Sequence, residues 1–393
     1  MAPKISVIIP VYNSEKYIEE TLNSALNQTL IDIEVVCVDD GSSDASNAII
    51  KGVGARDSRV VLLRQQNMGP SAARNAGIIK ATGEYIVFLD SDDMFFDNTA
   101  LEEIYNHAST LKLDQLMFDV RAFYETEELE EKFPDYKTYY KRRFDYVGVM
   151  QGKKLYVLMQ ENKDFKVSTF VECLRREFLI KNKLYFEKNI KSHEDNVFTT
   201  QCTMLSKRSA YVNKVFYTRR VREDSLVTNP DNFNSVWGCY LAVKALTRFF
   251  GERLTAEDRD VQKAFMERIF ALEDTAGKIY ISETNGGTWG SILDRVSDEE
   301  RGEFFVTVRT WATSRRRWER ASDRKQKIKE LKGQNKELEA QNKKLKAQNK
   351  KLKGENKKLK GENKKIKNSH SYKLARAITF IPRKIRKIFM KNA

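Results

Sequence analysis

Histidine and cysteine are scarce in this 393-residue sequence, which has three of the former and four of the latter. Cys37, Cys173, Cys202 and Cys239 are far apart and form neither a Cys-x-x-Cys motif nor a disulfide-type pattern. No apolar run approaches the roughly 18 residues of a membrane-spanning helix, and no signal-like segment precedes the strand pattern that begins at Ile5. These absences argue against a zinc site, a disulfide framework and a transmembrane helix. They predict a cytoplasmic protein, or one bound to a membrane from its cytoplasmic side.

Charge is distributed unevenly along the chain. The whole sequence has a formal net charge of +15. Residues 315–393 hold 29 Lys and Arg against 7 Asp and Glu, a net charge of +22, whereas residues 1–314 have a net charge of −7. The sequence therefore predicts a mildly acidic globular body followed by a strongly basic tail.

Short apolar runs alternate with helical patterns over the first hundred residues. Strands are predicted at residues 5–9, 33–38, 59–63 and 84–89, the first of them ended by Pro10. A helix is predicted over residues 14–28 with Ser14 as its N-cap. This alternation predicts an α/β fold with a mostly parallel sheet, whose ligands bind beyond the carboxyl ends of the strands. We therefore expect the loops after these strands to converge.

Three carboxylates, those of Asp90, Asp92 and Asp93, follow the last of these strands. Carboxylates at the end of a buried strand are costly to ionise unless a cation lies nearby. The Asp-x-Asp spacing suits Mg²⁺ or Mn²⁺, which proteins hold by one or two carboxylates together with substrate phosphates. The alternative is a strand followed by a solvated acidic turn.

Four segments resemble the motifs of the family 2 glycosyltransferases, which have the GT-A fold. They are Pro10-Val-Tyr-Asn13, Val38-Asp-Asp-Gly-Ser-Ser-Asp44, Asn67-x-Gly-x-Ser-x-Ala-Arg-Asn75 with Gly77, and Gly83-x-Tyr-x-x-Phe-Leu-Asp-Ser-Asp-Asp93. Their order and spacing are similar to those of the family. The resemblance is strong over about residues 4–100, looser to about residue 228, and does not extend to the tail.

The resemblance implies a site for a nucleoside-diphosphate sugar, in the first place a UDP-sugar. Asp40 would accept a hydrogen bond from uracil N3–H with Asp39 in support, and Pro10 and Tyr12 would line the nucleoside pocket. From the residues alone, a capped turn is the alternative, and it suits Asp39 better than Asp40.

The diphosphate side of that site is implied in the same way. Arg74 would contact the diphosphate or the base side of the pocket, and its alternative is a surface ion pair. Asp90 would face the ribose and, with Asp92, the Mg²⁺ or Mn²⁺ that stabilises the departing diphosphate. Arg219 and Arg222 are candidate phosphate contacts, with a solvated strand edge as the alternative.

The segment His193-Glu-Asp-Asn-Val-Phe198 resembles the acceptor-site motif of the family, in which the aspartate is the general base. A base is needed because a sugar hydroxyl is a poor nucleophile until its proton is accepted. Asp195 is the predicted base, and Glu194 would position it or the acceptor. The alternative is an acid-rich helix N-terminus, and His193 is predicted to be structural.

The segment Arg315-Arg-Arg-Trp318 lacks the glutamine of the Gln-x-x-Arg-Trp motif of processive synthases, so we expect one sugar to be added per encounter. Residues 97–150 are interpreted only as helical patterns with a solvated acidic run at 125–131. Helices are predicted at residues 236–250 and 257–281, packed on the transferase core.

A heptad repeat begins at Gly333. It places asparagine at position a and an aliphatic residue at position d, the latter being Leu338, Leu345, Leu352, Leu359 and Ile366. Asparagine at a favours a parallel, in-register dimer, and Glu355 and Glu362 at g would face Lys360 and Lys367 at e of the partner. The alternative is a solvated, lysine-rich single helix.

Residues 372–390 alternate aliphatic residues with Lys and Arg at helical spacing. Such a basic amphipathic segment is typical of an anionic membrane interface. Nucleic-acid binding is the rival function for a basic tail, but no nucleic-acid motif accompanies it. The tail therefore predicts peripheral attachment to the inner face of the cell membrane, which suits a lipid-linked acceptor.

Together these patterns predict four regions: a GT-A domain at 1–228, a helical extension at 229–314, a basic coiled coil at 315–368 and an amphipathic tail at 369–393. The predicted function is inverting, metal-dependent transfer of one sugar to a cell-envelope or exopolysaccharide glycan. The alternative is a non-catalytic, glycosyltransferase-like scaffold organised by its coiled coil.

Overall fold

The chain divides into two compact units, residues 1–315 and residues 316–393. The computed structural model describes residues 3–223, 225, 232–254, 256–257, 259–284 and 297–379. The predicted boundary at 228/229 and the tail from residue 380 onward lie outside the described residues.

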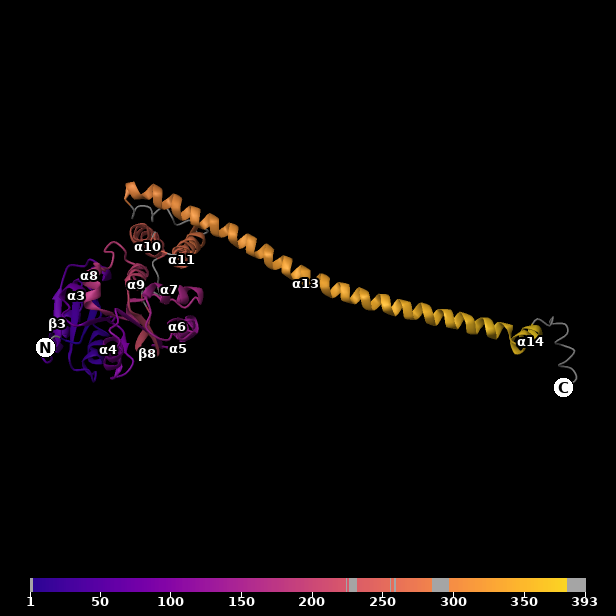
Figure 1. The fold of residues 1–393 in the computed structure, drawn as a ribbon, viewed down its shortest axis with the longest axis horizontal. Helices are drawn as coiled ribbons and strands as arrows, with labels where there is room; N and C mark the ends of the chain where they lie inside the picture. The colour runs from indigo at the N-terminus through magenta and orange to yellow at the C-terminus, as the bar shows by residue number, and fades with distance from the viewer. Residues whose placement is uncertain are drawn as a thin grey trace. The chain divides into compact units, whose positions relative to one another are not determined.

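An eight-stranded mixed sheet, in the order β3-β2-β1-β4-β7-β6-β8-β5, forms the centre of the first unit (Figure 1). The strands are β1 (Ile5–Val11), β2 (Ile33–Asp39), β3 (Val60–Arg64), β4 (Tyr85–Phe88), β5 (Met94–Phe95), β6 (Gln115–Tyr124), β7 (Glu172–Arg175) and β8 (Ser209–Val221). β3, β2, β1 and β4 are parallel to one another, β7 is antiparallel to β4 and β6, and β8 pairs in parallel with β6 and antiparallel with β5. The predicted α/β sheet is confirmed.

Helices follow most strands of the first unit. They are α1 (Ile18–Leu26), α2 (Ser46–Gly54), α3 (Pro70–Lys80), α4 (Ala100–Thr110), α5 (Glu127–Lys132), α6 (Tyr136–Tyr139), α7 (Gly152–Glu161), α8 (Arg176–Asn182), α9 (Glu194–Leu205), α10 (Asn232–Arg253) and α11 (Arg259–Thr284). A 3₁₀ turn at Thr169–Val171 precedes β7.

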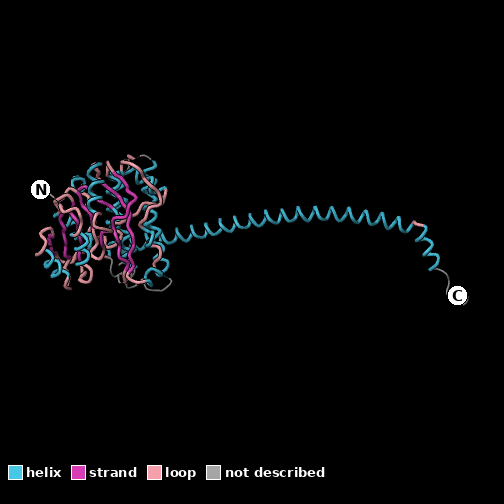
Figure 2. Tube along the Cα trace, turned by 90° about the horizontal axis from the view of Figure 1, so that it is seen from below, coloured by secondary structure: helices cyan, strands magenta, loops and turns pink. Residues whose placement is uncertain are grey.

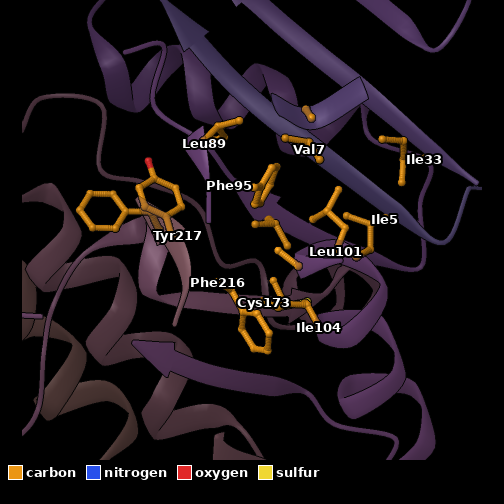
Figure 3. Close-up of a cluster of buried hydrophobic side chains, with 14 of the residues drawn as sticks. Ile5, Val7, Ile33, Leu89, Phe95, Leu101, Ile104, Cys173, Phe216 and Tyr217 are labelled. Carbon is orange, nitrogen blue, oxygen red and sulfur yellow. The ribbon is translucent and has the colours of Figure 1, made fainter. Parts of the chain in front are cut away.

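Successive residues of β1 point to opposite faces of the sheet, as the period of a strand requires. Val7 lies in one core with Leu101 and Ile104 of α4 (Figure 3). Ile8 lies in the other, against the face of α3 that carries Gly77. A Cβ on Gly77 would lie 2.3 Å from Ile8 Cγ2, so glycine is what lets α3 approach the sheet this closely.

The prediction that Pro10 ends the first strand is wrong, because β1 continues to Val11. Ile8 O accepts from Leu89 N on the β4 side, so Pro10, two residues on, faces the same side, beyond the last paired residue of β4. No ladder donor is needed there, and proline is tolerated. The predicted start of the first helix at Ser14 is also wrong, since Ser14 O accepts from Tyr17 N in a turn before α1.

The interpretation of residues 97–150 missed β6, the longest partner of β8. Its first six residues are all buried, but Gln115 and Asp119 interrupt the apolar run by which a buried strand is recognised. The acidic run is not simply solvated, because residues 127–132 form α5 with Leu129 buried. Glu125 lies 3.5 Å from Arg220, as an ion pair.

The predicted helices beyond residue 230 are confirmed as α10 and α11, which pack against α9 and α7 within the first unit. Phe233, Tyr240 and Phe265 belong to a buried cluster with residues of α7 and α9, and Phe304 of α13 (Asp298–Asn368) belongs to it as well. Figure 1 shows α10 and α11 beside α7 and α9.

The heptad repeat lies on α13, which is one continuous helix (Figure 2). The five aliphatic side chains at position d are each 55–57 % exposed in the single chain. A short helix, α14 (His370–Thr379), follows, and Leu374 on it is exposed. Among the described residues, no helix is long and apolar enough to span a bilayer.

Candidate functional site

The loops that follow β1, β2 and β4 meet at one edge of the sheet. Asn13 N, after β1, donates a hydrogen bond of 3.0 Å to Ser42 Oγ, after β2. Ser14 Oγ lies 2.6 Å from Ser91 Oγ, after β4. The expected convergence at the carboxyl ends of the parallel strands is therefore confirmed.

Asp39 is fully buried and closes the turn after β2. Its carboxylate accepts from Ser42 N over 2.9 Å and from Asn47 Nδ2 over 2.7 Å, and Arg64 Nε lies 3.3 Å away. The capped-turn alternative thus describes Asp39 well, with Gly41 in the left-handed region at φ 79°.

Asp40 holds the loop that leads into α3. Its Oδ1 accepts from Gln65 Nε2 over 2.7 Å and from Met68 N over 3.0 Å, and its Oδ2 accepts from Gly69 N over 2.8 Å. Both oxygens therefore have partners, and the predicted contact with a nucleobase would use their remaining acceptor capacity. Nearby, Pro10 is partly exposed and Tyr12 is 52 % exposed, which leaves a ring face accessible at the predicted nucleoside pocket.

The three aspartates after β4 have different partners. Asp93 is buried, and it accepts from Tyr217 Oη over 2.7 Å and from Arg220 N over 2.7 Å. Burial, together with the charges of Asp92 and Asp90, raises the pKa of the Asp93 carboxyl well above its usual range. Asp93 thus anchors β8 to this loop, whereas the side chains of Asp90 and Asp92 remain partly exposed.

Asp92 accepts a 2.7 Å hydrogen bond from Arg222 Nε. The pKa of Asp92 is raised above its usual value. Burial is the main cause, Arg222 opposes it, and the neighbouring charge of Asp90 adds to it. A divalent cation would offset both the burial and this repulsion, so the pair fits Mg²⁺ or Mn²⁺. The part of the chain that the structure describes gathers no three His, Cys, Asp or Glu side chains as a metal site.

Arg74 of α3 lies between the predicted donor and acceptor residues. Its Nη2 donates to Asp90 Oδ1 over 2.9 Å, and its Nη1 donates to Glu194 Oε1 over 2.8 Å. Arg74 is only 7 % exposed, so the surface ion pair is excluded. The pKa of Glu194 is raised to about 7. Burial is the main cause, Arg74 opposes it, and the adjacent Asp195 adds to it.

Asp195 lies in the first turn of α9, as the helix N-terminus alternative also predicted. Its Oδ1 accepts from Asn196 N over 2.7 Å and from Asn196 Nδ2 over 2.9 Å. His193 precedes the helix with φ 67° and contacts Ser235 Oγ over 3.1 Å. Burial lowers the pKa of His193, with a smaller lowering by Arg268 against a rise from Asp195. These contacts fit the structural role predicted for His193.

The arginines of β8 and its end do not share one environment. Arg219 donates to Tyr140 Oη over 3.1 Å, and its guanidinium lies 4.7 Å from the ring centroid of Tyr136. Arg219 and Arg220 are 8 % and 9 % exposed, so the solvated strand edge is wrong for both. Arg222 Nε pairs with the carboxylate of the predicted metal ligand Asp92, and Arg220 Nε donates to the backbone oxygen of Asp92 over 2.9 Å.

Sequence reasoning missed two residues of this site. Tyr217 bridges Asp93 and the backbone N–H of Asp90, to which its Oη is an acceptor over 3.1 Å. Arg268 of α11 donates to Asn196 Oδ1. Tyr217 lies two residues before the candidate Arg219 and could have been found there. In contrast, nothing in the helical pattern around Arg268 distinguishes it from a surface arginine.

Comparison with known proteins identifies related sequences. Residues 6–209 match the family described as Glycosyl transferase family 2. Glycosyltransferase GlyA of Streptococcus pneumoniae is 34 % identical over 57 % of this chain and 31 % of its own length. Poly(ribitol-phosphate) beta-glucosyltransferase of Bacillus spizizenii is 34 % identical over 58 % of this chain and 35 % of its own length. The chain therefore spans about a third of each of these curated relatives.

Among solved structures, that of S. aureus TarS resembles this chain with a TM-score of 0.52 at 20 % sequence identity. The likeness covers 79 % of this chain and 55 % of the other. At this identity the likeness concerns the fold alone.

Proposed function

The chain belongs to glycosyl transferase family 2 and has its GT-A fold, and from this premise we propose that it transfers one sugar from a nucleoside diphosphate to a glycan, with inversion. The proposed donor nucleotide is UDP. One observation carries the proposal: Arg74 joins Asp90 on the donor side to Glu194 on the acceptor side through one buried side chain. The residues proposed for the donor side and those proposed for the acceptor side are therefore close together, as transfer at one anomeric carbon requires.

On the donor side, Asp90 and Asp92 would hold Mg²⁺ or Mn²⁺, which when bound neutralises charge on the departing diphosphate. Arg222 keeps Asp92 oriented through its Nε contact. Asp40 and Tyr12 would bind the nucleoside, the first by its remaining acceptor capacity and the second by its exposed ring.

On the acceptor side, Asp195 would take the proton of the attacking hydroxyl. The acceptor oxygen then bonds to the anomeric carbon as the bond from that carbon to the diphosphate oxygen breaks. One displacement with one base inverts the configuration. Glu194, held by Arg74, would orient the acceptor.

The proposed acceptor is a cell-envelope glycan, carried on a lipid or part of a polymer. One of the relatives is named for transfer to poly(ribitol phosphate), which makes a phosphate-containing polymer the first acceptor to test. The basic tail, with 29 Lys and Arg against 7 Asp and Glu over residues 315–393, suits both such a polymer and an anionic membrane surface. We place the protein at the inner face of the cell membrane, as a homodimer through its coiled coil.

The deciding experiment is a screen of the full-length protein against a panel of UDP-, GDP- and dTDP-sugars with Mg²⁺, Mn²⁺ or EDTA. Release of the nucleoside diphosphate, dependent on metal and lost in Asp195→Asn, supports an enzyme. If no sugar nucleotide is turned over with any acceptor polymer while the protein still self-associates, the non-catalytic scaffold replaces the enzyme.

A further inference from the structure

The start of α9, where Asp195 lies, is held from the helical region that follows the family match. His193 Nε2 contacts Ser235 Oγ of α10 over 3.1 Å, and Arg268 of α11 donates to Asn196 Oδ1. Both helices lie beyond residue 209, the end of the family match. The helical region therefore reaches the predicted acceptor side with specific polar contacts as well as with apolar packing.

Asn196 connects Arg268 to Asp195. The Asn196 side chain is buried, and an amide has its oxygen and its nitrogen on opposite edges. Because Arg268 binds the oxygen, the nitrogen is directed to Asp195 Oδ1, which it meets over 2.9 Å. The backbone N–H of Asn196 donates to the same oxygen over 2.7 Å. Among the described residues, the carboxylate is thus held by one oxygen, and Oδ2 is left for another partner.

Several charged and titratable groups surround Asp195, and Arg268 is the cation that the helical region contributes. Burial raises the pKa of Tyr139, Arg268 lowers it, and Asp195 raises it, so both charges act on one hydroxyl. The groups that face Asp195 are His193 and Glu194 of its own segment, Tyr139 and Tyr140 at α6, Cys239 of α10 and Arg268 of α11.

Arg268 also has a second hydrogen-bond donor, its Nε. Its Nε is buried and has no hydrogen-bond partner within the described part of the chain. A buried donor without an acceptor destabilises the folded state, and an acceptor oxygen would remove that cost.

We propose that Arg268 is a positioning residue for Asp195, acting through the side chain of Asn196. It fixes the Asn196 amide, which in turn presents Asp195 Oδ2 to the acceptor hydroxyl. The inference rests on the proposed function in that it takes Asp195 as the base. It gives the helical region a task in the reaction that the family match alone does not contain.

The test compares Arg268→Met and Arg268→Lys with Arg259→Met, a control at an exposed arginine of the same helix. Hydrolysis of the donor uses water as acceptor, so it needs no identified glycan. Arg268→Met is expected to lower kcat about 10- to 100-fold with KM for the donor unchanged, since misplacing a catalytic group has an effect of this order.

The conservative variant and a double variant separate positioning from mere stability. Arg268→Lys keeps a cation at this position and should recover most of the lost kcat, and Arg259→Met should behave as wild type. Arg268→Met in an Asn196→Ala background should cause no further loss, because both act along one path. Additive losses, a raised KM for the donor with kcat unchanged in Arg268→Met, or losses that only follow thermal unfolding would each overturn the proposal.

A readout that needs no turnover distinguishes failure of this inference from failure of the proposed function. In the ¹H–¹⁵N spectrum of the full-length protein, the side-chain amide of Asn196 should be distinct from free amides. This distinct signal should be lost in Arg268→Met. If it persists in that variant, Arg268 does not position Asn196, whether or not the protein transfers sugar. If wild type neither hydrolyses nor transfers sugar while the amide responds as expected, the proposed function fails and the Arg268–Asn196–Asp195 linkage stands.

Discussion

Gln115 of β6 donates a 2.6 Å hydrogen bond to Glu172 of β7, and both side chains are fully buried. Thr199 Oγ1 of α9 donates to the same carboxyl over 3.1 Å. One buried acid therefore ties two strands to α9, whose first turn carries the predicted base. Burial raises the pKa of Glu172 to about 8, against smaller lowering effects of these two hydrogen bonds and of Arg142.

Glu172 should make the protein less stable as pH rises. At pH values between the unfolded pKa of about 4.3 and the folded pKa, the folded state holds a proton that the unfolded state has released. Stability is then lost as pH rises towards about 8. Glu172→Gln should remove this contribution, which amounts to about 5 kcal/mol for the full shift, as measured by urea unfolding from pH 5 to pH 8. Glu161→Gln, at an exposed acid, is the control, and parallel curves for wild type and Glu172→Gln would contradict the prediction.

Asp92→Asn should abolish metal-dependent binding of UDP and leave the fold intact. The amide can still accept from Arg222 Nε but lacks the charge that a divalent cation requires. Calorimetry with UDP and Mn²⁺ measures the loss. Asp32→Asn, at an exposed aspartate before β2, should bind as wild type does, and unchanged affinity in Asp92→Asn would remove Asp92 from the metal site.

Asp195→Asn should bind donor normally and lose turnover by about 10²–10⁴-fold, the usual effect of removing a general base. The substitution leaves the oxygen that accepts from Asn196 in place. Steady-state transfer and donor affinity measured side by side test it. Turnover within a few-fold of wild type would assign the base to another residue.

Much of the fold was predictable because its first four strands and the helices between them follow a regular local pattern. β1, β2, β3 and β4 are short apolar runs joined by helices, so their parallel pairing and the meeting of their loops follow from pattern alone. The pairing of β6 with β8 was not predictable, since Gln115 pairs with Ser209 far along the chain and polar residues interrupt the apolar run.

The sequence motifs name candidate residues for the site but do not give their contacts. They single out Asp92, Asp195 and Arg74, yet whether Arg74 lies on the surface depends on the packing of α9 against α3. The same holds for Arg219, whose tyrosine partners come from a segment without a recognised motif. Contacts of this kind are set by tertiary packing, which local patterns do not encode.

The heptad seam should make the full-length protein a dimer. Leu345 and Leu352 are more than half exposed in the single chain, and a partner helix would bury them. Leu345→Asn with Leu352→Asn should therefore give a monomer by light scattering. Ala340→Asn with Ala347→Asn, at position f of the same heptads, should remain a dimer. A monomeric wild-type protein would refute the pairing.

The basic segment at the C-terminus should bind anionic membranes independently of pairing. Deleting residues 370–393 removes the cationic aliphatic stripe and leaves the heptads intact, so the variant should stay dimeric but no longer co-sediment with vesicles that contain an anionic lipid. Neutral vesicles are the control for the anionic lipid. Salt should weaken binding of the full-length protein because its cations attract the surface over a distance that salt shortens. Vesicle binding that survives the deletion would locate the membrane contact elsewhere in the chain.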